Sequence, residues 1–181
     1  MPFFTLAMVP GGNIQRTIGE IKKLSSHKGL GCGAAWLPDG IYLGFYTGRP
    51  EIKIASRRFA RLCAGVFEAM PARFEFSRAE THAGMSYLVP EHPMAAIAES
   101  AGGVAASLGL SSANTTVFRP GLGFFIGKDV TLPSFKTFSF RHLDLSLMKI
   151  ETEGDELLAA TWTVLAKAPR RVGPRSRILE E

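Results

Sequence analysis

Residues 138–166 read FSFRHLDLSLMKIETEGDELLAATWTVLA, and this stretch decides the fold class. Apolar residues fill 138–150 and again 157–166, and polar residues at 153–155 separate them, which predicts two strands joined by a turn. A third strand is expected over 115–126, with no helical pattern between it and the other two. Three strands in succession favour an α+β fold with mainly antiparallel sheets over a doubly wound parallel sheet.

The chain before this stretch mixes strands and helices. Short apolar runs that end at proline or glycine predict strands, and apolar residues at helical spacing predict helices. The expected order is strand, helix, strand, helix, two strands, helix and three strands, which again indicates an α+β fold. The expected strands are 3–9, 41–46, 73–77 and 81–89, and the expected helices are 13–24, 51–70 and 93–108.

The composition is that of a folded globular domain. The 181 residues are 46% hydrophobic and 20% charged, which excludes intrinsic disorder and a collagen-like or coiled-coil rod. The formal net charge is +5, but five basic residues crowd the last fifteen positions, so the preceding part is nearly neutral. We therefore expect one domain over 1–167 and a flexible basic tail over 168–181. Those five residues are Lys167, Arg170, Arg171, Arg175 and Arg177.

Cysteine usage and the first residues bear on the compartment. Cys32 and Cys63 form no CxxC motif and are too few for a disulfide scaffold. The opening MPFFTLAMVPGG has no basic segment, and its apolar run is too short for a signal peptide or a membrane span. We expect a cytoplasmic protein that does not associate with membranes. Because no P-loop, His-Glu-x-x-His motif or acidic metal cluster occurs, we also expect no cofactor.

Four sequence segments have a family pattern. They are FFTL at 3–6, WLP at 36–38, IYLGFYTG at 41–48 and FRPGLGF at 118–124. In this order, followed by a closing pair of strands, they resemble the two-histidine phosphoesterase superfamily, the LigT-like fold of RNA 2′,3′-cyclic phosphodiesterases and 2′-5′ RNA ligases. The resemblance implies a bilobal domain of two antiparallel sheets with helices packed outside and a ligand cleft between the lobes.

The catalytic motifs of that family are replaced in this chain. Members carry two His-x-Thr/Ser motifs that face each other across the cleft, where one imidazole acts as general base and the other as general acid. In the matching register the first pair becomes Ile41 and Leu43, and the second becomes Gly121 and Gly123. None of these side chains transfers a proton. The resemblance therefore implies a catalytically degenerate protein that binds a nucleotide, RNA or another small ligand in the cleft.

Two other histidines leave an alternative open. His82 and Ser86, like His142 and Ser146, are four residues apart, which on a continuous strand places both side chains on one face. An active phosphodiesterase on 2′,3′-cyclic or 2′-5′-linked nucleotides would use His82 and His142 as acid and base and the two serines as phosphate ligands. Equally, both histidines are ordinary sheet residues bonded to their neighbours.

Basic residues suggest a third class of function. Lys53, Arg57 and Arg61 follow one another at helical spacing and share one helix face. Together with the basic tail they are expected to form a cationic track for RNA, or else a solvated surface. A protein-interaction module whose tail binds an acidic partner is the remaining alternative. The sequence gives no indication of the oligomeric state.

Overall fold

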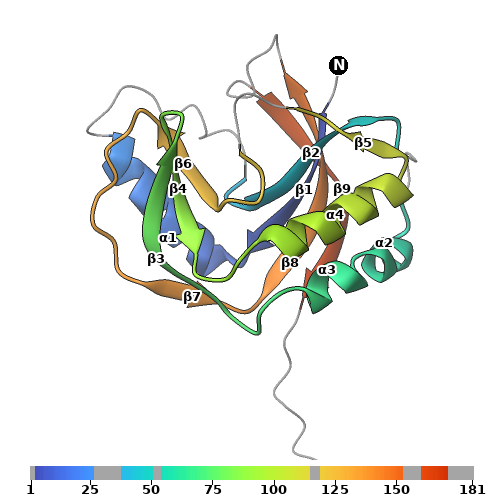
Figure 1. Ribbon diagram of the computed structural model, residues 1–181, viewed down its shortest axis with the longest axis horizontal. Coiled ribbons are helices and arrows are strands. Elements are labelled where there is room, and N and C mark those ends of the chain that lie inside the picture. The colour runs from blue at the N-terminus through green and yellow to red at the C-terminus, as the bar shows by residue number, and fades with distance from the viewer. Residues whose placement is uncertain (1–2, 27–37, 51–53, 115–118, 153–159, 171–181) are drawn as a thin grey trace, which may run out of the picture.

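The computed structural model describes residues 3–26, 38–50, 54–114, 119–152 and 160–170 (Figure 1). Within these residues the chain forms nine strands and four helices in mixed order. Every strand pairing is antiparallel. The expectation of an α+β fold with antiparallel strands is therefore confirmed. No helix in the described ranges has the length and apolar character needed to cross a membrane.

The helices and strands have the following bounds. The helices are α1 (Gly12–Ser26), α2 (Ser56–Leu62), α3 (Ala64–Glu68) and α4 (Ala95–Ser107). The first five strands are β1 (Phe3–Pro10), β2 (Ile41–Gly48), β3 (Phe74–His82), β4 (Met85–Pro90) and β5 (Leu110–Ser112). The last four strands are β6 (Phe124–Lys128), β7 (Phe138–Phe140), β8 (Leu143–Thr152) and β9 (Ala160–Arg170).

The strands form one continuous sheet, where the family resemblance implies two. Their order is β7-β3-β4-β6-β2-β1-β8-β9, and the short β5 also pairs with β2. The middle of the sheet is narrow, because β6 and β2 pair only at Phe124 and Ile41. Next to this pair, the Gly121 N–H donates a hydrogen bond to the Tyr42 carbonyl oxygen at 2.7 Å. In Figure 1, β3, β4 and β6 lie on one side of this junction and β1, β8 and β9 on the other.

The two faces of the sheet are covered differently. One buried group, the helix-side cluster, contains residues of all four helices, among them Ile18, Phe59, Val66 and Ile97. The other, the strand-side cluster, draws its buried residues from strands alone within the described part of the chain. The helices therefore all pack against one face. The strand-side cluster consists of Ala7, Tyr42, Phe45, Met85, Tyr87, Val89, Phe125, Met148 and Ile150.

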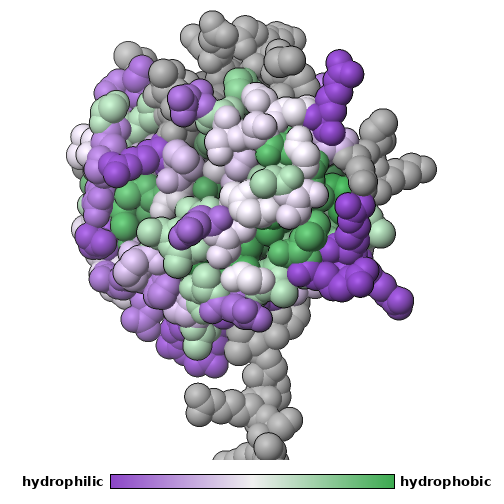
Figure 2. Space-filling view, turned by 45° about the vertical axis from the view of Figure 1, so that its right-hand side comes forward, coloured by the Kyte–Doolittle hydropathy of each residue, from purple (hydrophilic) through white to green (hydrophobic). Residues whose placement is uncertain are grey.

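The outer surface of α4 carries little charge. Its exposed residues include Ala95, Ala96, Gly103 and Ala106, with Glu99 as the charged exception. Figure 2, turned so that the right-hand side of Figure 1 comes forward, shows hydrophilic residues mainly at the margins and pale or hydrophobic residues over the centre. The outer surface of α4 therefore offers few polar groups to a ligand.

The helix expected over 51–70 is divided into α2 and α3 at Cys63. Hydrogen bonds from the Cys63 N–H to the Phe59 oxygen and from the Phe67 N–H to the Cys63 oxygen, both 3.0 Å, keep helical spacing across the division. The Cys63 side chain is fully buried, and burial raises the pKa of its thiol to about 12. This cysteine is thus a core residue, while residues 51–53 lie outside the described part.

A two-residue turn separates β3 from β4 and corrects the strand expected over 81–89. Ala83 and Gly84 have φ of 50° and 79°, and His82 pairs with Met85 across them. Two successive residues with positive φ are the signature of a type I′ hairpin turn. His82 and Ser86 therefore lie on different strands, and the prediction that they share one strand face is wrong. An Ala-Gly pair is a weaker turn signal than Asn-Gly, so the sequence pattern does not indicate this turn.

The closing strands also depart from the expected bounds. The predicted strand over 138–150 is split, because β7 pairs with β3 in one part of the sheet and β8 pairs with β1 in the other. The last strand reaches Arg170, whose Nη2 donates to the Pro71 carbonyl oxygen at 2.8 Å. The first three residues of the expected tail, 168–170, are thus part of the sheet. Residues 171–181 lie outside the described part.

Candidate functional site

Polar side chains line the end of β3. Arg78, Glu80 and His82 alternate along the strand and therefore share one face. Their partners across the pairing with β4 are Val89, Tyr87 and Met85, all members of the strand-side cluster. The three polar side chains consequently lie on the sheet face that no described helix covers.

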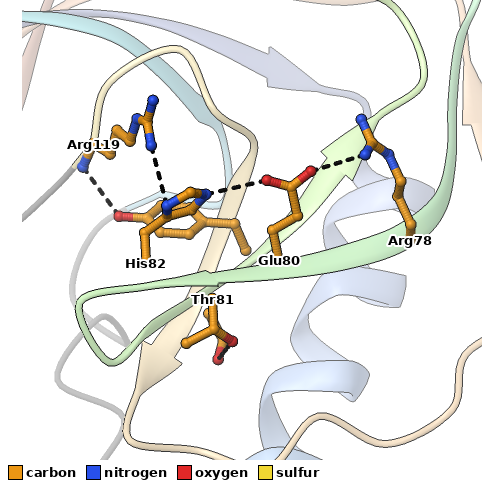
Figure 3. A network of polar contacts seen from close by, with 7 residues as sticks. Arg78, Glu80, Thr81, His82 and Arg119 are labelled. Carbon is orange, nitrogen blue, oxygen red and sulfur yellow. Dashed lines mark hydrogen bonds and ion pairs between the residues drawn. The ribbon is translucent and has the colours of Figure 1, made fainter.

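A continuous network joins these side chains to a distant loop (Figure 3). Glu80 accepts a hydrogen bond from Arg78 Nη1 at 2.9 Å, and its other oxygen lies 3.1 Å from Nε2 of His82. The second ring nitrogen of His82, Nδ1, lies 3.1 Å from Nη1 of Arg119, which precedes β6. The order of the network is therefore Arg78, Glu80, His82, Arg119.

The network fixes the protonation of the His82 ring. A guanidinium carries only donors, so Nδ1 of His82 must accept the hydrogen bond from Arg119. The ring proton then sits on Nε2 and is donated to the Glu80 carboxylate. Both ring nitrogens of His82 are thus engaged, and neither is free to act as acid or base while Arg119 is in place.

Arg119 is also held through its backbone. Its N–H donates to the Tyr87 hydroxyl at 3.0 Å, and that hydroxyl in turn lies 3.8 Å from Sδ of Met85. Burial raises the pKa of Tyr87, while the hydrogen bond and charge of Arg119 oppose the rise. The Tyr87 ring packs on Phe125 with centroids 5.6 Å apart. The base of the Arg119 side chain is therefore anchored to the strand-side cluster.

The network is accessible and carries net positive charge. The side chains of Arg78, Glu80 and His82 are 53%, 32% and 36% exposed. Two guanidiniums and one carboxylate leave one positive charge on these three side chains. Guanidinium donors match the paired oxygens of phosphate and carboxylate groups, so the site suits an anion with such oxygens.

Ile41 and Leu43, predicted to line the cleft, are buried in the helix-side cluster instead. The pairing of β2 with β1 skips one residue between Gly44 and Tyr42, so β2 carries a bulge at Leu43. On either side of the bulge, the side chains of Tyr42 and Phe45 are the ones that belong to the strand-side cluster. The expected cleft lining by Ile41 and Leu43 is therefore corrected, because both side chains face the helix side of the sheet, and the bulge changes the alternation only from Gly44 onward.

Gly121 and Gly123 serve backbone packing at the narrow junction of the sheet. Gly121 has a φ of +71° and donates its N–H to Tyr42. A Cβ on Gly123 would overlap the Leu88 carbonyl oxygen of β4. Both positions therefore favour glycine for conformation or close approach. The tight contact at Gly123 leaves no room for a ligand there.

The two candidate phosphate-binding serines are both buried. Ser86 Oγ lies 3.2 Å from Thr81 Oγ1, and these two residues face away from His82, on the opposite side of the hairpin. Ser146 pairs with Ala7 and points to the strand-side face, where its Oγ has no hydrogen-bond partner among the described residues. Neither serine belongs to the His82 network.

His142 lies in a different part of the sheet. It precedes β8, and in the sheet order the strands β4, β6, β2 and β1 lie between β3 and β8. With Gly11, Asn13 and Arg141, it lines a pocket of about 410 Å³ at the start of α1. His92 packs edge-on to Phe74 with centroids 6.2 Å apart. The structure therefore does not bring His142 or His92 into the network of His82.

The expected basic track is only partly visible. Arg57 and Arg61 are exposed on α2, which contacts β9 at the other edge of the sheet from β3. Lys53 lies outside the described residues. The two arginines are therefore not part of the His82 network. Among the described residues no group of three or more His, Cys, Asp or Glu side chains is arranged to hold a metal ion.

Sequence reasoning missed Glu80 and Arg119. The alternation of Arg78, Glu80 and His82 was sufficient to place Glu80 beside the histidine. No local pattern connects Arg119 to His82, because they are 37 residues apart in sequence. No family model, curated protein or solved structure matches the chain. We therefore infer its function from the chemistry of the His82 site.

Proposed function

We propose that this chain is a non-catalytic, LigT-like binding protein that takes a phosphate-bearing ligand of the nucleotide class at the His82 site. The observation that carries the proposal is the hydrogen bond from Arg119 to Nδ1 of His82. It holds a guanidinium at the accessible surface at one end of the network, and Arg78 holds a second one at the opposite end, with Glu80 and His82 between them. A guanidinium binds phosphate oxygens through charge-assisted hydrogen bonds.

A two-lobed arrangement is part of the proposal. Only one residue pair, Ile41 and Phe124, joins β2 to β6 in the middle of the sheet. Each side of this junction has its own helices, since α1 contacts β6 whereas α4 contacts β2 and α2 contacts β9. Both observations support two small lobes that share one sheet, as the resemblance to LigT-like proteins implies.

The state of His82 favours binding over hydrolysis. General acid–base cleavage of a phosphodiester needs one group that accepts a proton and another that donates one. Both nitrogens of His82 are engaged, by Glu80 and by Arg119, and His142 lines a separate pocket. A phosphate that accepts the hydrogen bonds of Arg119 frees one nitrogen of the His82 ring. Among the described residues, no second histidine lies close enough to supply the other half of acid–base catalysis, so the ligand is bound and not cleaved.

The binding test is a calorimetric titration with AMP as the probe. We expect Arg119→Gln to weaken AMP binding by about tenfold or more, since charge-assisted hydrogen bonds contribute about 1.5–3 kcal/mol. The matched control is Arg73→Gln, an exposed arginine just before the opposite end of β3. Equal affinities of the two variants, or no AMP binding to the unaltered protein, would overturn the proposal.

The catalytic alternative has its own assay. We expect the purified protein to leave 2′,3′-cyclic AMP intact during incubations in which an active phosphodiesterase consumes it. Hydrolysis that disappears in both His82→Ala and His142→Ala would replace the binding proposal with an active phosphodiesterase.

A further inference from the structure

We propose that Lys128 is a second anion contact of the His82 site, so that the preferred ligand carries more than one phosphate. This inference rests on the proposed phosphate site and names its ligand class. The residue comes from β6, two strands away from His82 in the sheet order. It is exposed, and it forms no ion pair with another described residue.

Strand register puts Lys128 in line with His82. His82 pairs with Met85 across the hairpin, and Met85 pairs with Lys128 across the next ladder. Residues directly opposite each other in antiparallel strands project to the same face. The three side chains therefore form one row across β3, β4 and β6. With neighbouring strands about 4.8 Å apart, the outer two Cα atoms are about 10 Å apart.

The end of β6 is fixed against the hairpin turn. The Asp129 N–H donates to the Gly84 carbonyl oxygen at 2.7 Å, directly after Lys128. The Asp129 carboxylate lies over the turn, with Oδ1 2.6 Å from the position of a Cβ on Gly84. This contact anchors the backbone on which Lys128 stands. It also supplies a negative charge at the turn, so the anion-binding charges are those of Lys128 and the two arginines Arg78 and Arg119.

The middle of the row is apolar. Met85 is 9% exposed, and its Sδ accepts the Tyr87 hydroxyl. A single phosphate at Arg119 therefore meets cations at one end of the row only. A chain of phosphates extends along the row toward the Lys128 ammonium group, where the second charge interaction forms. The register thus predicts that Lys128 sets the preference for polyphosphate over monophosphate.

Inorganic phosphate and inorganic tripolyphosphate are the probes, titrated separately at constant ionic strength. We expect the unaltered protein to bind tripolyphosphate more tightly, and Lys128→Gln to weaken tripolyphosphate binding about fivefold but phosphate binding less than about twofold. Arg119→Gln weakens both. Lys23→Gln, an exposed lysine on α1, is the matched control and leaves both affinities unchanged.

The outcomes separate the two proposals. If Lys128→Gln weakens both probes equally, or neither, or if the unaltered protein binds the two probes equally well, the role of Lys128 is overturned while the phosphate site stands. If Arg119→Gln behaves like Lys23→Gln for both probes, the proposed phosphate site is wrong, and so is the role proposed for Lys128. Unchanged thermal unfolding of each variant shows that an affinity loss is local, since all three side chains are exposed.

Discussion

The Nη1 atom of Arg119 donates a hydrogen bond to Nδ1 of His82 at 3.1 Å. This one contact assigns the tautomer of the ring, because arginine has no acceptor to offer. It also brings the loop before β6 onto the end of β3, where Glu80 holds the other ring nitrogen. The site is thus defined by one long-range contact and one local contact.

The tautomer is directly measurable. We expect ¹⁵N NMR of the side chain to show a protonated Nε2 and an unprotonated Nδ1 for His82 at neutral pH. In Arg119→Ala the donor to Nδ1 is lost, so the proton should distribute between both nitrogens. A protonated Nδ1 in the unaltered protein would contradict the assignment.

The backbone of the hairpin turn next to the site is strained at Ala83, and a substitution there should relieve the strain. Ala83 has a φ of 50°, a region that costs a non-glycine residue about 1 kcal/mol. Ala83→Asn, which restores the preferred Asn-Gly pair, should raise the free energy of unfolding by about 0.5–1 kcal/mol. Gly84→Ala should lower it by about 1 kcal/mol or more, because it has positive φ and lies against the Asp129 carboxylate. Urea unfolding checks both, and a stabilised Gly84→Ala would refute the turn type.

The close approach of β6 to β4 makes one glycine indispensable. A Cβ on Gly123 would overlap a backbone atom, the Leu88 carbonyl oxygen. Gly123→Ala should therefore lower the free energy of unfolding by about 3 kcal/mol or more. Gly103→Ala is the matched control: no atom lies within 4 Å of its added Cβ, and the residue is inside α4. In that variant the free energy of unfolding should rise by about 0.8–1 kcal/mol, because alanine has a higher helix propensity than glycine. Thermal unfolding of the two proteins distinguishes the effects, and similar shifts would argue against this packing.

Alkaline pH should destabilise the protein through its buried phenols. Burial raises the pKa of Tyr46 from its ordinary 10.0 to about 12. Below pH 10 the phenol is neutral in the folded and unfolded chains, so its contribution to stability is complete. Between pH 10 and about 12 only the unfolded chain ionises, and stability falls by up to about 1.4 kcal/mol per pH unit for this group. Tyr46→Phe should flatten the pH dependence of the urea midpoint in this window; an unchanged slope would contradict the assignment.

Ser146 carries a buried hydroxyl without a hydrogen-bond partner among the described residues. An unsatisfied buried hydroxyl costs about 1–3 kcal/mol, so Ser146→Ala should leave stability unchanged or raise it by about 1 kcal/mol. Ser86→Ala is the comparison, because it leaves Thr81 without its partner at 3.2 Å and should lower stability. Chemical denaturation of both variants is the measurement. A loss with Ser146→Ala would show that the hydroxyl has a partner.

Local patterns predicted the order of helices and strands, but several bounds and side-chain faces were wrong. The alternation of Arg78, Glu80 and His82 belongs to a real strand, and the apolar run before Pro10 to a real β1. The predicted face was wrong for Ile41 and Leu43, which lie on the helix side of the sheet, and for His82 and Ser86, which the turn after His82 separates. Neither the side of the sheet that the helices cover nor the Ala-Gly turn leaves a strong sequence signal.

The α+β class could be predicted from the amino-acid sequence alone, because hydrophobic periodicity is a local property and three successive strands without a helix disfavour a doubly wound sheet. Of the two partners of His82, Glu80 and Arg119, the second follows from the tertiary arrangement alone. Arg119 reaches the ring because β6 lies beside β4 and β4 beside β3, so the end of β3 meets the loop before β6. That strand order depends on how all the apolar faces pack together, and no short segment encodes it.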